Sequence, residues 1–388
     1  MIKKKKKALI TIIILILILS GLAWLGITIA LFTLVYTATL HYIGLIQNQL
    51  LRKMTKGIFL FVFLLSIIIN VKLFAFDIYK IPSSSMENLL YPGDVIVVNK
   101  LIYGPRLPRS PFEIPTINLA FYMNIEARSR IKDNWWEYSR LDGTVRIKQG
   151  DVFVFNSTWD KNYILIKRCV ALPGDTLLIK KGEIYTNSIP FNSPETVKNR
   201  YSFRVKNKKT FYEIIDSIPI GGYISYDNTK RNSGSAIFSK EQFEFLKKKN
   251  CIDSVSKNID VYASQQELLK TPTSKWTLDN MGSIIIPKKG MEIKLNPENY
   301  MLYGNVINQC EKSILSEKKG HYFVNEKETI SYKFKLDYFF MMGDNRKETM
   351  DSRVWGFVPE YNIIGKVQGT LISNRNEEFQ WDRLFKIL

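Results

Sequence analysis

The sequence predicts a mainly β protein that is anchored in a membrane by helices at its N-terminus. Residues 8–46 and 58–76 are almost wholly apolar, whereas the remainder of the 388-residue chain is polar. From residue 77 onward, apolar residues fall in short runs rich in Val, Ile, Phe and Tyr and bounded by Gly, Pro, Asp and Asn, which is typical of strands. Helical periodicity is clear only in short stretches such as residues 240–249. A soluble cytosolic enzyme and an intrinsically disordered chain are therefore excluded.

The second apolar run, residues 58–76, is long enough to cross a membrane once. At about 1.5 Å per residue it would extend roughly 28 Å as a helix. Arg52, Lys53 and Lys56 immediately precede it, and basic residues beside a span favour the cytoplasmic side. We therefore expect everything after Phe76 to lie outside the cytoplasm.

The first apolar run, residues 8–46, is too long for one comfortable crossing, because a single helix of that length would extend about 58 Å. Lysines occupy positions 3–7, so both ends of the run carry the cytoplasmic charge pattern. Two crossings that fold back near residues 20–26 satisfy both ends. A single long or partly interfacial helix with its N-terminus outside is the alternative. A cleavable signal peptide is disfavoured, because the apolar run continues without a polar cleavage region.

Composition divides the chain into five parts. Residues 1–57 form an N-terminal membrane region with one or two spans and a short cytoplasmic loop, and residues 58–76 form a transmembrane helix. A β core begins with residues 77–184 and is completed by residues 336–388. Between them, residues 185–335 are rich in lysine and carry no chemical motif. We interpret this stretch as an inserted cap that flanks the core.

The chain is strongly basic, with 55 Lys and Arg residues against 36 Asp and Glu residues and a formal net charge of +19. A basic excess that follows a membrane anchor fits a position next to anionic lipid headgroups. Nucleic-acid binding is the rival interpretation, but the sequence has no helix-turn-helix, zinc-finger spacing or RNP-like strand. We therefore expect the lipid bilayer as a partner and no nucleic acid.

Cysteine and histidine are both scarce. Cys169, Cys251 and Cys310 have neither CxxC nor CxxxC spacing, so a structural zinc site and a dense disulfide framework are not indicated. A disulfide between Cys251 and Cys310 is left open. The two histidines are His41, within an apolar run, and His321, in a lysine-rich stretch. A Ser-His-Asp hydrolase therefore lacks a convincing base, and we expect no metal and no cofactor.

Three consecutive serines follow the last span, within residues 81–94 (IPSSSMENLLYPGD). Pro82 fixes its own φ and biases Ile81 towards an extended shape, so the serines are expected at a strand-to-turn junction. The simplest alternative is a serine-rich juxtamembrane linker without chemistry.

A lysine stands within an apolar strand at residues 163–175 (YILIKRCVALPGD). Because alternate residues of a strand share a face, Lys167 is grouped with Leu165 and Cys169. Such a lysine is either an edge residue whose amine reaches solvent or a desolvated amine. Desolvation lowers the pKa of an amine, which could then take a proton from a serine hydroxyl in place of histidine. The shortage of histidine and this strand indicate the same chemistry.

A third segment, residues 341–367, is dense in Gly, Asp, Asn and Arg between strands. Thr349 offers a hydroxyl that could orient the lysine amine. Exposed ion pairs on a turn would contribute little, whereas buried ones would fix a loop. Four charged residues could form such pairs: Asp344, Arg346, Asp351 and Arg353.

Together these segments resemble bacterial type I signal peptidases, also called leader peptidases. The matching motifs are IPSSSM after the anchor, YGPRLP, GDVFVFN, IKRCVALPGD, and MMGDNRKETMDSRVWGFVPE with IIGKV. They occur in the family order and cover about residues 58–104, 148–180 and 336–371. The middle region matches more loosely and resembles the expanded cap of Bacteroidetes-type members. The resemblance implies a signal-peptidase-like core of antiparallel sheets with an inserted cap.

Carried over by motif, the resemblance makes Ser85 the nucleophile and Lys167 its general base. Ser83 matches the serine whose hydroxyl forms the oxyanion hole with the Ser85 backbone N–H. Thr349 stands where the family usually has a serine that is hydrogen-bonded to the lysine. Two structural salt bridges are matched as well: Arg168 with Asp344, and Asp351 with Arg353.

Around the serine motif the chain departs from the family in two respects. The family often follows the motif with x-Pro-Thr-Leu, whereas this chain has Glu87-Asn88-Leu89-Leu90. The middle position of the motif is Ser84, where glycine is also common. No reacting group is lost by these changes. The resemblance also implies shallow pockets for small substrate residues, and we expect their walls from nearby apolar side chains: Ile81, Met86, Leu90, Leu165 and Ile166.

The implied activity is that of a serine endopeptidase that removes signal peptides from exported preproteins at the outer face of the bacterial cytoplasmic membrane. Its partners would be the signal peptides of secretory preproteins and the lipid bilayer, and contact with the secretion machinery is left open. The protein would be multi-pass, with its catalytic part on the periplasmic or extracytoplasmic side. Two alternatives remain: a related Ser/Lys processing peptidase, and a catalytically inactive membrane-anchored β scaffold. The oligomeric state is not predicted.

Overall fold

The computed structural model forms two compact units, and each is described by itself. One unit comprises Met1–Tyr79, Val97–Ile147 and Ile364–Lys366, and the other comprises Lys80–Ile96, Lys148–Ile363 and Val367–Leu388. The structure describes residues 2–124, 126, 129–130, 136–160, 163–215, 224–226, 232–260, 269, 275–375 and 378–388.

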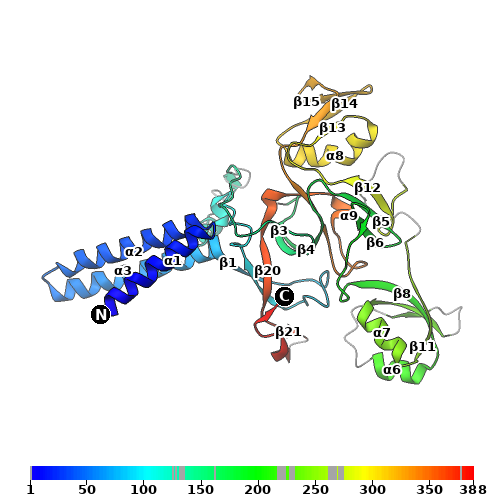
Figure 1. Ribbon diagram of the computed structural model, residues 1–388, viewed down its shortest axis with the longest axis horizontal. Coiled ribbons are helices and arrows are strands. Elements are labelled where there is room, and N and C mark those ends of the chain that lie inside the picture. The colour runs from blue at the N-terminus through cyan, green and yellow to red at the C-terminus, as the bar shows by residue number, and fades with distance from the viewer. Residues whose placement is uncertain are drawn as a thin grey trace. The chain divides into compact units, whose positions relative to one another are not determined.

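Three helices form the N-terminal part of the first unit: α1 (Ile2–Leu19), α2 (Ala23–Gly44) and α3 (Gln49–Asn70). They run alongside one another in Figure 1. Residues 8–46 thus form two helices that are separated by a turn at residues 20–22, and not one continuous helix. The number of crossings in this region stays a prediction. Within the described residues, two helical segments are long and apolar enough to cross a membrane, Ala23–Gly44 and Gln49–Ala75, and Ala8–Leu19 is a shorter apolar helix.

The third helix begins well before the apolar run that starts at residue 58. Asn48 caps it, because the Asn48 side chain accepts hydrogen bonds from the backbone N–H groups of Leu50 and Leu51. A π-helical turn (Val71–Ala75) ends the segment. The Lys100 amine donates to the carbonyl of Lys72 at 2.7 Å and pairs with Asp77 at 3.0 Å, which satisfies the end of this turn. The remaining elements of this part are short: β1 (Phe76–Lys80), β2 (Val95–Asn99), a 3-10 helix (Pro111–Glu113) and α4 (Ile117–Tyr122).

The second unit is built on a strongly apolar sheet. Its strands follow one another in the order β20 (Ile363–Ile372), β3 (Val152–Asn156), β4 (Ile164–Ala171), β18 (Tyr338–Met342) and β19 (Val358–Pro359), and β23 (Lys386–Ile387) pairs with β20. The pairs β3–β4 and β4–β18 are antiparallel. Every residue of β3 and β18 is buried, as expected for strands that are covered on both faces. The predicted mainly β core is confirmed.

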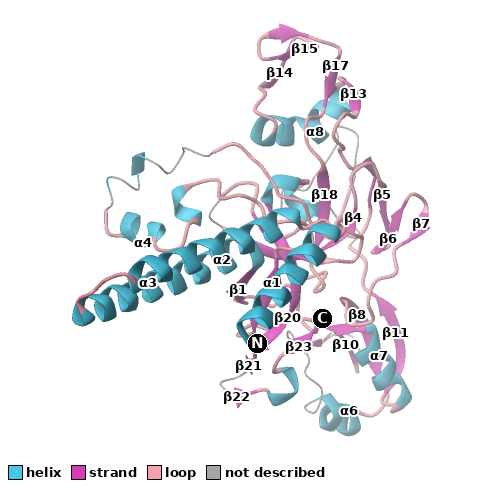
Figure 2. Cartoon of the chain, turned by 60° about the vertical axis from the view of Figure 1, so that its left-hand side comes forward, coloured by secondary structure: helices cyan, strands magenta, loops and turns pink. Residues whose placement is uncertain are grey.

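A second sheet of this unit has the order β12 (Met281–Ile285), β5 (Thr176–Lys180), β6 (Glu183–Thr186) and β7 (Ile189–Pro190). It shares one hydrophobic core with α8 (Pro297–Cys310) and with the β4–β18 sheet. Figure 2 shows α8 beside four short strands. These strands are β13 (Glu292–Lys294), β14 (Leu315–Lys318), β15 (His321–Val324) and β17 (Ser331–Lys333), with β16 (Lys327–Glu328) paired to β15.

The lysine-rich stretch also contains a sheet with its own core, in the order β11 (Ile252–Lys257), β8 (Lys198–Val205), β10 (Ser233–Ser239) and β9 (Ser225–Tyr226). The helices α6 (Lys208–Ile215) and α7 (Lys240–Lys248) pack on it through Phe211 and Leu246. Ser239 and Gln242 form a capping box at the start of α7, where the sequence predicts a helix. The region 185–335 therefore has two parts: one packs in the main core and one has a core of its own.

The C-terminal elements of this unit are short: α9 (Ser352–Trp355), a 3-10 helix (Glu360–Asn362), β21 (Asn374–Arg375), β22 (Glu378–Phe379) and a last 3-10 helix (Trp381–Arg383). Cys169, Cys251 and Cys310 are all described and buried, and none of them forms a disulfide, so the structure contains no Cys251–Cys310 bond.

Candidate active site

The three serines of the motif lie on a tight turn that is closed at its base by the backbone. The N–H of Ile81 donates to the carbonyl of Asp94 at 2.7 Å, and the N–H of Gly93 donates to the carbonyl of Ile81 at 2.9 Å. Within the turn, the N–H of Leu90 donates to the carbonyl of Met86 at 2.8 Å. Ser85 is half-buried at this turn, and Ser83 is exposed.

Lys167 lies on β4 and reaches the Ser85 turn across 82 positions of sequence. Its Nζ atom donates to Ser85 Oγ at 2.8 Å and to the carbonyl of Ile166 at 3.0 Å. Only 3% of Lys167 is exposed, and the fully buried Phe153 stands directly opposite it on β3. The lysine is thus a desolvated amine in contact with one hydroxyl, and not an edge residue.

The surroundings of Lys167 alter its acidity. Burial, which disfavours the charged ammonium, lowers the pKa of Lys167 to about 8, although the carboxylates of Asp351 and Asp344 act in the opposite direction. At pH 7 about a tenth of the amine would then be neutral, far more than for an exposed lysine. A neutral amine at 2.8 Å from a hydroxyl can accept its proton.

Two further hydroxyls were predicted beside this pair. Ser83 Oγ lies 3.4 Å from Ser85 Oγ, so a second hydroxyl adjoins the nucleophile candidate. Thr349 Oγ1 donates to the carbonyl of Met350 at 3.5 Å, and no hydrogen bond joins it to Lys167 in the described part of the chain. Thr349 is nevertheless near, because a Cβ added to Gly343 would collide with both its hydroxyl and the Ser85 carbonyl oxygen. Its orienting role stays a prediction.

The segment that follows β18 is fixed to the site by two buried ion pairs. Arg168 binds Asp344 through two hydrogen bonds of 2.8 and 2.5 Å, and Arg353 binds Asp351 through two of 2.9 and 2.8 Å. Between them, the N–H of Asn345 donates to the carbonyl of Ser85 at 3.0 Å. Paired guanidinium and carboxylate groups of this kind hold a fixed geometry, so the backbone that contacts Ser85 is rigidly placed.

A comparison with known families matches most of the chain. The family model described as "Signal peptidase, peptidase S26" matches residues 53–255 and 285–372. The chain belongs to this family. The resemblance inferred from the sequence is confirmed.

Known signal peptidases are similar over most of the chain. The protein named "Signal peptidase I" from Buchnera aphidicola subsp. Baizongia pistaciae is 25% identical over 82% of this chain and 76% of its own length. Those of Haemophilus influenzae and Helicobacter pylori (strain 26695) are 24% and 26% identical, over 83% and 77% of this chain and 70% and 76% of their own lengths.

The residues predicted to form the walls of the substrate pockets fall into a buried group and a half-buried group. Ile81, Met86 and Leu90 are buried, and Leu90 has no exposed surface at all, so it can support a pocket only from behind. Leu165 and Ile166 are half-buried on β4, beside Lys167. The substrate pockets stay a prediction.

Two contacts at the site were not predicted from the sequence. Lys198, at the start of β8, pairs with Glu87 at 2.9 Å. Lys347 pairs with Asp260 at 2.8 Å and with Asp279, both from a stretch that the signal peptidase family model does not match. Lys198 lies in a lysine-rich stretch without a motif, which gave no signal for it. Lys347 lies in the segment 341–367, where the sequence drew attention to other charged residues.

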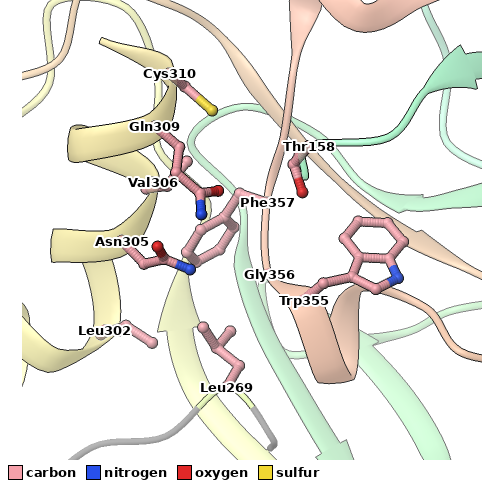
Figure 3. A pocket seen from close by; sticks show the side chains of 10 residues that line it. All are labelled: Thr158, Leu269, Leu302, Asn305, Val306, Gln309, Cys310, Trp355, Gly356 and Phe357. Atoms are coloured by element: carbon pink, nitrogen blue, oxygen red, sulfur yellow. The ribbon is translucent and has the colours of Figure 1, made fainter. Parts of the chain in front are cut away.

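A separate pocket lies between α8 and the segment that follows α9. Figure 3 shows the amide groups of Asn305 and Gln309 on α8 near the ring of Phe357, while the indole nitrogen of Trp355 is turned away from them. None of its lining residues belongs to the Ser85–Lys167 site. Within the described residues, no cluster of His, Cys, Asp and Glu could hold a metal ion.

Proposed function

We propose that this member of the signal peptidase family cleaves signal peptides from exported preproteins with Ser85 as nucleophile and Lys167 as general base. The observation that carries the proposal is the distance of 2.8 Å between a buried lysine amine and a serine hydroxyl. Neither group is unusual alone, but their contact places a proton acceptor on the one hydroxyl that can attack.

The reaction begins when neutral Lys167 takes the proton of Ser85 and Oγ forms a bond with the carbonyl carbon before the cleavage site. The negative charge on the carbonyl oxygen would be held by the Ser85 N–H and the Ser83 hydroxyl, whose Oγ lies 3.4 Å from Ser85 Oγ. The carbon–nitrogen bond then breaks, and the lysine ammonium gives its proton to the leaving amine.

An acyl-enzyme on Ser85 remains after this step. Lys167, neutral again, accepts a proton from water as the water oxygen attacks the ester carbon. The signal peptide leaves with a new carboxyl end, and the proton returns to Ser85 Oγ. His321 is an unsuitable base, because it is exposed and its Nδ1 lies 2.6 Å from Glu328.

The same proposal covers the location of the protein. Arg52, Lys53 and Lys56 lie at the start of α3, so we infer that this end is cytoplasmic and that the catalytic unit faces the outside of the bacterial cytoplasmic membrane. With two spans or more the protein is multi-pass and has the lipid bilayer as a partner. The mechanism needs no direct contact with the secretion machinery, since the apolar segment of the substrate lies in the same bilayer.

The test is cleavage of a short peptide with an A-x-A site by the full chain in detergent or liposomes, followed by mass spectrometry. Ser85→Ala should reduce the rate at least about 1000-fold, because the nucleophile is lost. Ser84→Ala is the matched control and should keep most of the activity, since no hydrogen bond of the Ser84 hydroxyl is found in the described residues. Normal cleavage by Ser85→Ala would refute the proposal.

A further inference from the structure

The turn that carries Ser85 is held from outside by the start of β8. Lys198 is completely buried, and its Nζ atom lies 2.9 Å from Glu87 Oε2. The side-chain amide of Asn88 donates to the carbonyl of Thr196 at 3.0 Å. The two residues that follow Met86 are therefore both bound to a short segment more than one hundred positions later in the sequence.

The backbone of Lys198 binds a second part of the site at the same time. Its N–H donates to the carbonyl of Asp344 at 2.8 Å, and its carbonyl accepts from the N–H of Arg346 at 3.1 Å. The residue between these two, Asn345, donates its N–H to the carbonyl of Ser85 at 3.0 Å. A closed ring of contacts thus includes the nucleophile candidate, Ser85, together with Asn345, Lys198 and Glu87.

The residue types of the turn that carries Ser85 supply only part of the rigidity of that turn. Asn88 has a φ of 77°, a left-handed conformation. Proline, with φ fixed near about −65°, cannot stiffen the turn at this position. A left-handed asparagine is tolerated but not fixed by its own sterics. Hydrogen bonds within the turn hold its base, and contacts with other parts of the chain add the remaining stiffness.

A buried ion pair is suited to that task. The Glu87 side chain is 10% exposed and that of Lys198 is 0% exposed, so a displaced partner would leave an unpaired charge in a poorly solvated place. Any shift of the Ser85 turn relative to residues 344–346 therefore meets a steep penalty. An exposed ion pair would offer little resistance, because water replaces the lost partner.

We propose that Lys198 is a positioning residue, which holds the Ser85 turn against residues 344–346 so that Ser85 Oγ stays within reach of Lys167. The inference rests on the proposed function of Ser85. Lys198 touches neither the substrate nor the reacting atoms, and acts through Glu87 and Asn345. A displacement of about 1 Å at a reacting group can cost about 100-fold in rate.

The experiment compares Lys198→Met with wild type in the peptide cleavage assay. We expect kcat to fall about 10- to 100-fold and KM to change less than about twofold, because the completely buried Lys198 side chain cannot itself contact the substrate. The acid limb of the pH profile should stay in place, since the carboxylates that act on Lys167 are Asp351 and Asp344. Lys198→Arg should restore kcat to within about threefold of wild type, because it keeps the charge and a donor.

Two controls separate positioning from general loss of stability. Phe211→Leu weakens the core of the same β8 sheet, where Phe211 is fully buried, and should lower Tm without lowering kcat. Lys240→Met removes an exposed pair with Glu195, whose side chains are 66% and 69% exposed, and should change neither. A kcat loss in Phe211→Leu equal to that of Lys198→Met would overturn the inference.

A second variant keeps the inference testable if Lys198→Met folds poorly. Glu87→Met combined with Lys198→Met replaces the ion pair with apolar side chains and leaves no unpaired buried charge. Reduced kcat in this folded double variant supports the inference. If this double variant has the kcat of wild type while Ser85→Ala is inactive, the inference on Lys198 is overturned and the proposed function stands. Cleavage by Ser85→Ala overturns the proposed function and this inference with it.

Discussion

Two regions of the larger unit each bury a lysine, and the two lysine amines contact different kinds of group. On β4, Lys167 is 3% exposed and its amine contacts a hydroxyl and a carbonyl, with no carboxylate in ion-pair contact within the described residues. At the start of β8, Lys198 is 0% exposed and its amine contacts the carboxylate of Glu87. The same side chain, removed from water to a similar degree, contacts a hydroxyl in one region and a carboxylate in the other, and we propose proton transfer for the first and attachment for the second.

The difference between Lys167 and Lys198 shows that the group in contact with the amine, and not burial alone, decides what a buried lysine can do. Without a carboxylate in contact, the low-dielectric surroundings favour the neutral amine, which is the form that can act as a base. With a carboxylate at 2.9 Å, the two charges hold each other and fix the backbone on either side. On β4 the fully buried Phe153, directly opposite Lys167, excludes both water and a counter-charge.

The largest difference between the two regions should appear when each lysine is replaced by arginine. Lys167→Arg should lose at least about 1000-fold in kcat/KM, because a guanidinium stays protonated and cannot accept the proton of Ser85. Lys198→Arg should remain active, because its task needs only a cation. Peptide cleavage by the two purified variants measures the difference directly. Equal losses in both variants would contradict the assignment of different roles.

A smaller but sharper effect concerns pH. In the proposed mechanism the neutral form of Lys167 is the base. Because burial lowers its pKa to about 8, kcat/KM should rise as pH rises through this value and level off above it. At pH 6 the rate should be about 100-fold below the plateau. Circular dichroism at each pH shows that the protein stays folded. An acid limb near about 10.4, the value of an ordinary lysine, would show that the amine is not desolvated during the reaction.

The smallest effect is expected at Thr349. Its hydroxyl donates to the carbonyl of Met350 and has no bond to Lys167 in the described residues, so Thr349→Val should reduce kcat at most about fivefold. Thr349→Ser is the matched variant that keeps the hydroxyl. The pH profile decides between the two interpretations of this residue. A displaced acid limb in Thr349→Val alone would mean that the hydroxyl contacts the amine during the reaction.

The sequence was sufficient for those parts of the site that have a chemical signature. A serine motif after a membrane span, a lysine in an apolar strand and a shortage of histidine indicated serine–lysine chemistry. The resemblance to type I signal peptidases assigned it to Ser85 and Lys167, which lie in contact across 82 positions. The mainly β core followed from short runs of β-branched and aromatic residues. Both depend on patterns that are local in the chain and therefore visible before folding.

What escaped prediction depends on contacts between distant segments. Lys198 looks like any other residue of a lysine-rich stretch, and only the pairing of its backbone with residues 344–346 brings it to Glu87. The division of the region 185–335 into two parts was hidden for the same reason. Leu302 and Ile307 of α8 join the main core, whereas Phe211 and Leu246 build another, although all four are apolar helix residues.

The ring of contacts around Ser85 also has a consequence for biosynthesis. Ribosomes deliver the membrane helices first, Ser85 soon afterwards, and Asn345 close to the end of translation. The contacts that Asn345 makes with Ser85 can form only after this late segment has emerged, so we expect a shorter nascent chain to lack the proposed alignment of Ser85 with Lys167.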